Sequence, residues 1–305
     1  MYYFIVNAAS RTGKAKKIWN QMEEYLKEKQ IDYMAFQSKY AGHAKELAKE
    51  ISNFSEPVLK LIVLGGDGTV NEVLNGIVNF DKIRLGYIPT GSGNDFGRGL
   101  SLPKDPLAAL NRILSATEDY VMDIGQVTYG RRKRYFAISS GVGIDADVCK
   151  QALISKIKVF LNRLRLGKLT YLLLTIKALK SMPTTEAEIR FSDGTVKKIE
   201  KMIFVVGMNE RTEGGGVPMA PKADDKDGLL SVCVVHGLSR KKAFFLLPFL
   251  VLGKHEGIKG FDIINCRNYS VKLKDAMVLH ADGEYCGEVK EMTFSCVPAK
   301  LHILK

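Results

Sequence analysis

Two apolar segments that each run into a glycine-rich loop are the feature that most constrains the fold of this chain. Residues 61–63 are Leu-Ile-Val and continue as LGGDGTVNE over 64–72, and residues 83–88 continue as IPTGSGNDF over 88–96. A helix-patterned stretch follows the first loop. Strands joined by right-handed crossovers through helices are parallel, so both loops should leave the carboxyl edge of one sheet. Open α/β sheets bind their ligands at this edge.

The first third of the chain alternates strand and helix patterns. We expect strands over 3–6, 32–36, 59–64 and 83–88, and helices over 15–29, 43–51, 69–79 and 106–114. Asp105-Pro106 has the form of a helix start, with proline in the first turn. The pattern predicts an α/β protein whose N-terminal domain, residues 1–120, is a Rossmann-like or phosphofructokinase-like parallel sheet.

From about residue 121 the pattern changes to short segments bounded by turn residues. The expected strands there cover 124–128, 135–139, 187–191, 202–207, 229–235, 270–273, 277–280 and 292–296. Such spacing predicts a C-terminal antiparallel, β-rich, sandwich-like domain over 121–297, with the boundary between Glu118 and Asp123. Residues 298–305 are a candidate return to the first domain.

Composition limits the partners. The 305 residues carry a formal net charge of +12, which favours nucleotides, nucleic acid or a negatively charged bilayer as partners. No basic segment is interleaved with aromatic residues, so we expect no nucleic-acid partner. The five cysteines are scattered without a CxxC pair, as in a cytoplasmic protein with reduced thiols. The longest apolar run, residues 243–252, contains Pro248 and is too short to span a bilayer, so membrane contact should be peripheral.

The two loops have the chemistry of a phosphate site. Glycines let backbone amides approach an anion, and a following helix directs its positive end at the same place. Asp67 can hold Mg²⁺ or its water shell, Thr90 and Ser92 offer hydroxyls, and Asp95 adds a second carboxylate. The alternative for Asn94 with Asp95 is a helix N-cap. Neither loop has the Walker pattern or GxGxxG.

GGDGT followed by Asn71-Glu72, and then PTGSGNDF, together resemble the diacylglycerol kinase catalytic-domain family, which includes bacterial lipid kinases and sphingosine kinases. NAD kinases and phosphofructokinases share the first motif, and the second loop separates them from this family. The resemblance covers nearly the whole chain and implies a lipid kinase that uses ATP and Mg²⁺. The nucleotide-binding residues expected from the loops and the resemblance are Asn7, Ser38, Gly65, Gly66, Asp67, Gly68, Thr69, Asn71, Glu72, Thr90, Gly91, Ser92, Asn94 and Asp95.

Two positions depart from the family pattern. The first strand of the family ends in Asn-Pro-x-Ser-Gly, whereas this chain continues from Asn7 as NAASRTGK, with alanine for proline and two additional residues before the glycine. Ser38 stands where the family has threonine and keeps the hydroxyl. Asn7 therefore carries over, and the contacts of residues 8–14 stay open.

Carboxylates in the second domain are the candidate catalytic groups. Asp282-Gly283-Glu284 alone reads as a hairpin turn. The resemblance implies that Asp282 is the general base and that Glu284 shares or orients this role. A carboxylate suits the task because it accepts the proton of the attacking hydroxyl. Neighbouring His280 is expected to lie on a strand face rather than to bind a ligand.

A second acidic group lies in ADDKDGL, residues 223–229. Asp224, Asp227 and the Leu229 carbonyl could form a cation loop, although an acidic surface turn has the same composition. The resemblance implies a structural Mg²⁺ there. It also implies that Asp123 joins Asp67 and Asp95 in the catalytic Mg²⁺ network, the alternative being a cap at the domain junction. GVGID, which ends at Asp145, is expected to have a backbone role.

Residues 153–164 and 169–179 have leucine, isoleucine and phenylalanine at helical spacing with lysine and arginine between them. This pattern favours docking on an anionic membrane surface, or core packing with solvated lysines. We expect a cytoplasmic, peripherally membrane-associated protein and a possible homodimer. The acceptor hydroxyl stays open among diacylglycerol, phosphatidylglycerol, a polyprenol and a sphingoid base. A kinase of a soluble alcohol or of NAD, and a non-catalytic lipid-binding module, are the other classes.

Overall fold

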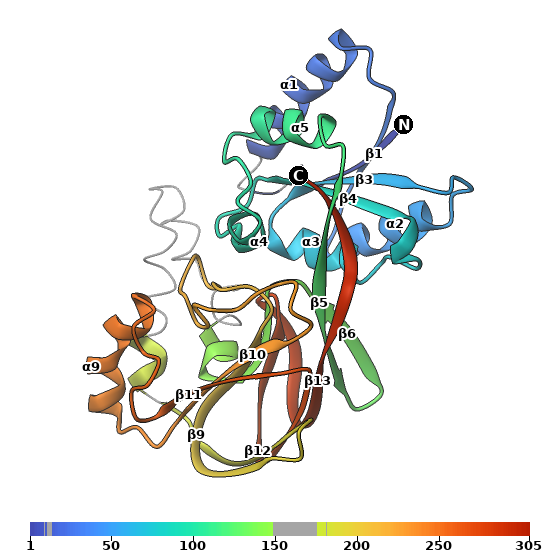
Figure 1. Ribbon diagram of the computed structural model, residues 1–305. Helices are drawn as coiled ribbons and strands as arrows, with labels where there is room; N and C mark the ends of the chain where they lie inside the picture. The colour runs from blue at the N-terminus through green and yellow to red at the C-terminus, as the bar shows by residue number, and fades with distance from the viewer. Residues whose placement is uncertain (9, 11–13, 149–175, 181) are drawn as a thin grey trace. The chain divides into compact units, whose positions relative to one another are not determined.

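The computed structural model describes residues 1–8, 10, 14–148, 176–180 and 182–305 (Figure 1). The chain divides into two compact units, one formed by Met1–Met122 with Ala299–Lys305 and the other by Asp123–Pro298. It passes from the first unit to the second within β5 (Asp119–Tyr129) and returns within β13 (Glu284–Leu304). Among the described residues, no helix has the length and apolar character needed to cross a membrane.

The first unit is built on a parallel sheet in the order β2-β1-β3-β4. These strands cover Tyr33–Gln37, Tyr2–Val6, Leu59–Gly65 and Ile83–Pro89. The end of β13 adds to the sheet beside β4, also parallel, with His302 opposite Arg84. β3 and β4 are buried along nearly their whole length, as expected for strands covered on both faces.

Helices cover this sheet. α1 (Lys14–Glu28) and α5 (Pro106–Leu114) pack on one face, where Trp19 and Leu110 join Phe4 and Ile62 in one core. α2 (His43–Ser52) contacts α3 (Asp67–Leu74), and these helices also contact β1 and β3 respectively. The start of α5 is as predicted, because the Asp105 side chain accepts from Ala108 N at the N-cap.

α3 differs from the expected helix over 69–79. It begins two residues earlier, at Asp67, and ends at Leu74. Just after its end, Gly76 packs against α2 so closely that an added Cβ would lie 2.2 Å from the Lys45 carbonyl oxygen. Position 76 therefore requires glycine.

The second unit is an antiparallel β structure, so the chain is a mixed α/β protein with a C-terminal β-rich part. Its main sheet has the order β11-β10-β9-β7-β12-β13, and β8 pairs with β9 and β12 while β6 pairs with β5. The strands are β6 Arg132–Phe136, β7 Ser139–Gly143, β8 Thr185–Phe191, β9 Val196–Met208, β10 Leu230–His236, β11 Phe261–Cys266 and β12 Asn268–Ala281.

Both faces of the second sheet are buried. Val232 and Val234 of β10 belong to one core, and Cys233 and Val235 belong to another. Successive side chains of a strand point to opposite faces, so one strand supplies both cores. The expected strand over 229–235 is accordingly apolar except at Ser231.

Several expected elements differ from the structure. The segment 135–139 is divided between β6 and β7, and the segments 270–273 and 277–280 belong to one strand, β12, with an irregular register between Lys272 and Met277. β11 and the helix α9 (Arg240–Val251) were not predicted. The basic helices expected over 153–164 and 169–179 lie outside the described residues, apart from the helical residues 176–179.

Candidate active site

The two glycine loops lie side by side. β3 and β4 are parallel neighbours with Gly65 opposite Pro89, so both loops leave the same edge, as predicted. Thr90 N donates to Gly65 O at 2.8 Å. A Cβ added to Gly91 would lie 2.7 Å from the Gly66 Cα, so a side chain there would collide with backbone. Glycine at this position lets the two loops form one backbone-lined cradle.

The Asp67 carboxylate joins the two loops. Its two oxygens accept from Asp95 N at 3.1 Å and Phe96 N at 3.2 Å, at the start of the short helix α4 (Asp95–Gly99). The Asp95 side chain forms an ion pair with Arg98. Asp67 therefore caps the helix of the second loop and lies beside Asp95, at the base of the cradle.

Asn94 and Tyr87 fix the shape of the second loop. Asn94 has left-handed backbone geometry, with φ of 51°, and its side chain makes no cap hydrogen bond. Its Nδ2 donates to Gly91 O at 3.1 Å, and its Oδ1 accepts from the Tyr87 hydroxyl at 3.2 Å. Burial raises the pKa of Tyr87 well above its usual value, and the charges of Asp67 and Asp95 raise it further. The side-chain cap that Asn94 could supply is thus replaced by Asp67.

Other expected nucleotide residues lie around these loops. Asn7 Nδ2 donates to Thr69 Oγ1 at 3.0 Å, and the hydroxyls of Ser10 and Thr90 are 2.8 Å apart, so the end of β1 is joined to both loops. Ser38 N donates to Val6 O at 2.9 Å, immediately after β2. Gly68 and Asn71 lie within α3, and Ser92 is exposed in the second loop.

Glu72 has a structural partner that the sequence did not indicate. Its two carboxylate oxygens accept from Gly42 N at 2.8 Å and Ala44 N at 3.1 Å, at the N-terminus of α2. A carboxylate at this end of a helix is favoured by the unpaired amides and by the helix dipole. Glu72 thereby holds α2 against α3.

The Asp282 carboxylate is bound by backbone amides of the second unit. Oδ2 accepts from Ala137 N at 2.9 Å, and Oδ1 accepts from Ile138 N at 2.8 Å and Ser139 N at 3.1 Å. This explains why the expected strand over 135–139 is interrupted, because these amides point at Asp282 instead of at a neighbouring strand. Backbone donors stabilise the ionised carboxylate, the form that a general base requires. Glu284 is half-buried at the start of β13.

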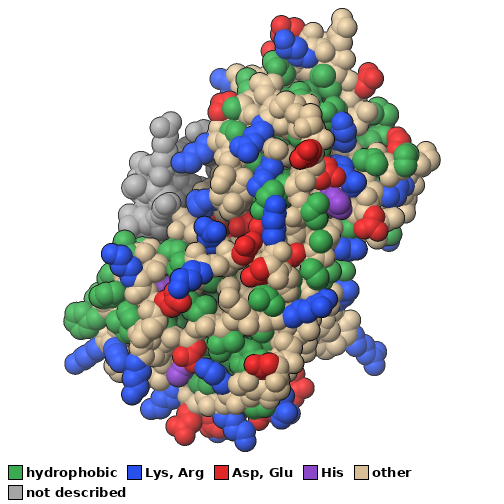
Figure 2. All heavy atoms as spheres, viewed as in Figure 1, with side chains coloured by type: hydrophobic (Ala, Val, Ile, Leu, Met, Phe, Trp, Pro, Cys, Tyr) green, Lys and Arg blue, Asp and Glu red, His purple; other side chains and the backbone are tan. Residues whose placement is uncertain are grey.

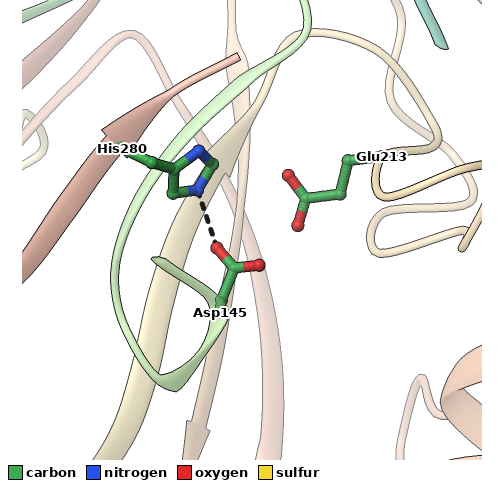
Figure 3. A group of neighbouring side chains, drawn as sticks. All are labelled: Asp145, Glu213 and His280. Carbon is green, nitrogen blue, oxygen red and sulfur yellow. Dashed lines mark hydrogen bonds and ion pairs between the residues drawn. The ribbon is translucent and has the colours of Figure 1, made fainter. Parts of the chain in front are cut away.

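His280, Asp145 and Glu213 are neighbouring side chains, of which His280 and Glu213 are buried and Asp145 is half-buried (Figure 3). His280 Nε2 lies 2.7 Å from Asp145 Oδ2, and its Nδ1 accepts from Gly283 N at 3.2 Å. Since Nδ1 is an acceptor, the proton of the neutral ring is on Nε2 and is donated to Asp145. Glu213 accepts from the Ser139 hydroxyl. Sequence reasoning gave Asp145 only a backbone role and missed Glu213, because no local pattern joins residues so far apart in the chain.

These three residues have the donor types of a metal site, with their ligand atoms all within 4.8 Å of one another. The ring of His280 also bridges Asp145 and the backbone amide of Gly283. The group is therefore a hydrogen-bonded support for the Asp282-Gly283-Glu284 turn.

Asp123 holds the expected cation loop. Its Oδ2 accepts from Gly228 N at 2.7 Å, and its backbone N donates to Asp225 O at 2.7 Å. Within the loop, Asp224 accepts from Lys226 N at 3.0 Å and Asp227 accepts from Leu229 N at 2.9 Å. Desolvation raises the pKa of Asp227, and the charges of Asp224 and Asp123 raise it too. Three carboxylates are thus concentrated at one loop of the second unit, whereas Asp67 and Asp95 belong to the first unit.

Comparisons with known proteins give matches over both units of the chain. Residues 1–127 match the diacylglycerol kinase catalytic domain, and residues 139–305 match the YegS C-terminal NAD kinase beta sandwich-like domain. The chain is 31% identical over 296 residues, 94% of each chain, to the Bacillus subtilis protein named "Putative lipid kinase YtlR". It is also 31% identical over 249 residues to the diacylglycerol kinase of Bacillus subtilis, covering 81% of this chain and 77% of that one.

The fold has solved counterparts. The crystal structure of a "putative diacylglycerol kinase" from Bacillus anthracis superposes with a TM-score of 0.80 at 21% identity, over 99% of this chain and 94% of that one. An NAD kinase from Archaeoglobus fulgidus in complex with ATP superposes with a TM-score of 0.53 at 13% identity, over 100% of this chain and 94% of that chain. These two likenesses concern the fold.

Proposed function

This chain belongs to the diacylglycerol kinase-like family of lipid kinases, and on that premise we propose that it transfers the γ-phosphate of ATP to a hydroxyl of a membrane lipid in a Mg²⁺-dependent reaction. Diacylglycerol, which would give phosphatidic acid, is the acceptor we favour, because relatives that match most of this chain are named diacylglycerol kinases.

The observation that carries the nucleotide half of this proposal is the close approach of Gly66 and Gly91. A cradle that a Cβ would fill brings backbone amides near a bound anion, and the start of α3 at Asp67 directs the positive end of a helix to the same place. The hydroxyls of Thr69 and Thr90, both held by neighbouring side chains, add donors for phosphate oxygens. This donor set fits a polyphosphate.

Asp67 and Asp95 would hold Mg²⁺. Asp67 already accepts two backbone hydrogen bonds and Asp95 forms an ion pair with Arg98, so we favour contact through the water shell of the ion. When bound, ATP with Mg²⁺ supplies the phosphoryl group and neutralises part of its charge. Asp224, Asp227 and the Leu229 carbonyl would hold a second, structural Mg²⁺.

Asp282 would act as the base. Three backbone amides keep its carboxylate in a fixed orientation and stabilise the ionised form, which can accept the proton of the acceptor hydroxyl. The same amides occupy three of about four acceptor positions of a carboxylate. Glu284, two residues later, would therefore share the proton or orient the hydroxyl.

We propose that the protein acts at the cytoplasmic face of a membrane, to which it binds peripherally as a homodimer. The test is a transfer assay in which the purified protein, γ-labelled ATP and Mg²⁺ are incubated with mixed micelles of diacylglycerol, phosphatidylglycerol, a polyprenol or a sphingoid base, each alone. Labelled phosphatidic acid that disappears when EDTA is added is the expected product. Transfer to NAD or glycerol with none to any lipid would contradict the proposal.

A further inference from the structure

We propose that the outer face of α9, with the basic residues at its two ends, docks the protein on a bilayer that contains anionic lipid. The choice of a bilayer as the partner rests on the proposed lipid kinase activity. The surface is defined by α9, whereas the basic helices that the sequence pattern indicated lie almost wholly outside the described residues.

α9 is apolar on two opposite faces. Ala243, Leu246, Leu247 and Leu250 contact one core of the second unit. The opposite face presents Phe244, Phe245, Phe249 and Leu252, which are 51%, 72%, 45% and 65% exposed. Residues three, four and seven positions apart lie on one side of a helix, so Phe245, Phe249 and the C-cap residue Leu252 form one stripe, with Phe244 at its edge. The inner face of α9 packs against the core, whereas the outer stripe is exposed to solvent.

This exposed stripe is unusual in the described part of the chain. Every exposed phenylalanine there lies in α9, and the exposed Val251 is adjacent. Large apolar side chains scattered singly on a surface need no explanation, whereas a contiguous exposed group indicates a binding surface. Aromatic and leucine side chains on one side of a surface helix are the groups that enter the boundary between lipid headgroups and acyl chains.

The charges at the ends of α9 select an anionic partner. Arg240, Lys241 and Lys242 are exposed at the N-terminus, and Lys254 is exposed just after the helix. No acidic residue occurs between positions 240 and 254. Cations at a helix N-terminus oppose the helix dipole, so helix stability does not account for them. Figure 2 shows the hydrophobic side chains over α9 with Lys and Arg side chains beside them.

Apolar insertion and charge would act together. Each lysine or arginine near an anionic surface contributes about 1 kcal/mol, and the attraction falls within a Debye length. The exposed phenylalanines add burial of apolar area, at about 25 cal/mol per Å². Binding should therefore need both an anionic surface and the apolar stripe, and it should weaken as salt is added.

Vesicle flotation tests the docking surface. The full chain is mixed, without ATP, with vesicles of phosphatidylcholine alone or of phosphatidylcholine with phosphatidylglycerol. We expect wild type to float with the anionic vesicles, and the double variant Phe245→Ser, Phe249→Ser to bind at least about 10-fold less, as the loss of about 1.4 kcal/mol would give. Lys241→Glu with Lys242→Glu should lose binding to a similar extent. Equal binding by wild type and both variants would overturn the proposal.

Matched controls separate this surface from general effects. Lys16→Glu with Lys17→Glu makes the same charge change on α1, and Met34→Ser removes an exposed apolar side chain elsewhere, so both should bind like wild type. All variants alter exposed positions and should keep the melting temperature and the transfer rate on a short-chain diacylglycerol in detergent. If wild type does not phosphorylate the short-chain diacylglycerol, the proposed function is contradicted, while the flotation result still tests the docking surface.

A fluorescence measurement gives a second, independent readout. Trp19 is buried in the first unit and is the only tryptophan, so Phe245→Trp adds one reporter on the exposed stripe. Its emission should shift to shorter wavelength with anionic vesicles and should be quenched by brominated lipid. The protein could float with the vesicles while the emission maximum of the new tryptophan stays at the wavelength of a water-exposed indole. This result would place the membrane contact elsewhere and overturn the assignment to α9.

Discussion

His280 Nε2 donates to Asp145 Oδ2 at 2.7 Å, while Nδ1 of the same ring accepts from Gly283 N at 3.2 Å. One buried ring thus joins a carboxylate to the turn that carries Asp282. The Ser140 hydroxyl donates to the carbonyl oxygen of His280 at 2.6 Å and supports the same strand end. This relationship makes Asp145 a positioning residue for the proposed base.

Asp145→Asn tests the positioning role. The variant replaces a charged acceptor by a neutral one, so we expect the free energy of unfolding to fall by about 1–3 kcal/mol. The turn should lose its fixed orientation, which lowers kcat while the KM for ATP stays unchanged. Chemical denaturation and steady-state kinetics measure the two effects, and the exposed Glu200→Gln is the matched control. An unchanged kcat would show that the turn is held without Asp145.

Asp282→Asn should lose both activity and stability. The asparagine keeps one oxygen acceptor but places its NH2 group opposite at least one of the amides of residues 137–139, so we expect a loss of about 1–3 kcal/mol in unfolding free energy. Removing the base should lower kcat by about 100-fold or more. Glu284→Gln changes a half-buried carboxylate outside this cluster of amides and should lower kcat with little loss of stability. Full transfer activity in Asp282→Asn would show that the base is another residue.

Gly91→Ala should separate the two glycine loops. The new Cβ would lie 2.7 Å from the Gly66 Cα and 2.8 Å from Asn94 Oδ1, and backbone cannot yield as a flexible side chain can. We expect the stabilisation of the protein by ATP in thermal unfolding to be lost. Gly97→Ala is the control, because its Cβ would meet only side-chain atoms, at 3.2 Å or more. A normal ATP shift in Gly91→Ala would exclude the cradle as the phosphate site.

The described cysteines should be unreactive in the folded protein. Burial raises the pKa of Cys266 and of Cys296 to about 12, and it also raises the pKa of Cys233 and Cys286. The thiolate is the reactive form, so these thiols should react with an aromatic disulfide reagent only after unfolding. The measurement uses Cys149→Ser, since Cys149 lies outside the described residues. Rapid labelling of this variant under native conditions would contradict the burial of these thiols.

The buried His255 should make the protein less stable to unfolding at acid pH. Burial lowers the pKa of His255, whose Nε2 contacts Met219 O at 3.0 Å. Below the ordinary histidine pKa of about 6.5, His255 binds a proton in the unfolded chain but stays neutral in the folded protein. The free energy of unfolding is therefore full above this pH. It falls as the pH decreases toward the lowered pKa of His255 in the folded protein. His255→Gln should flatten the pH dependence of the melting temperature between about 7.5 and 5.5. His43→Asn is the control, and an identical slope in His255→Gln and wild type would refute the assignment.

The amino-acid sequence was enough to predict the two glycine loops of the proposed nucleotide site. Apolar runs that end in glycine loops fixed the strands β3 and β4 and their loops, because a short loop is encoded by adjacent residues. The adjacent residues Asp105 and Pro106 likewise determined the start of α5. Family motifs in both loops then indicated the chemistry, and the comparisons confirmed a lipid kinase family.

Tertiary structure decided what each carboxylate contacts. Glu72 binds the start of α2, Asp67 caps α4, and Asp282 binds amides some 140 residues away in the chain. It also joined Asp145 to His280 and left the phenylalanines of α9 exposed. Periodicity in a sequence reports local conformation and average burial. The partner of a buried charge depends on which distant backbone amides the completed sheets bring to it, and only the folded chain contains that relationship.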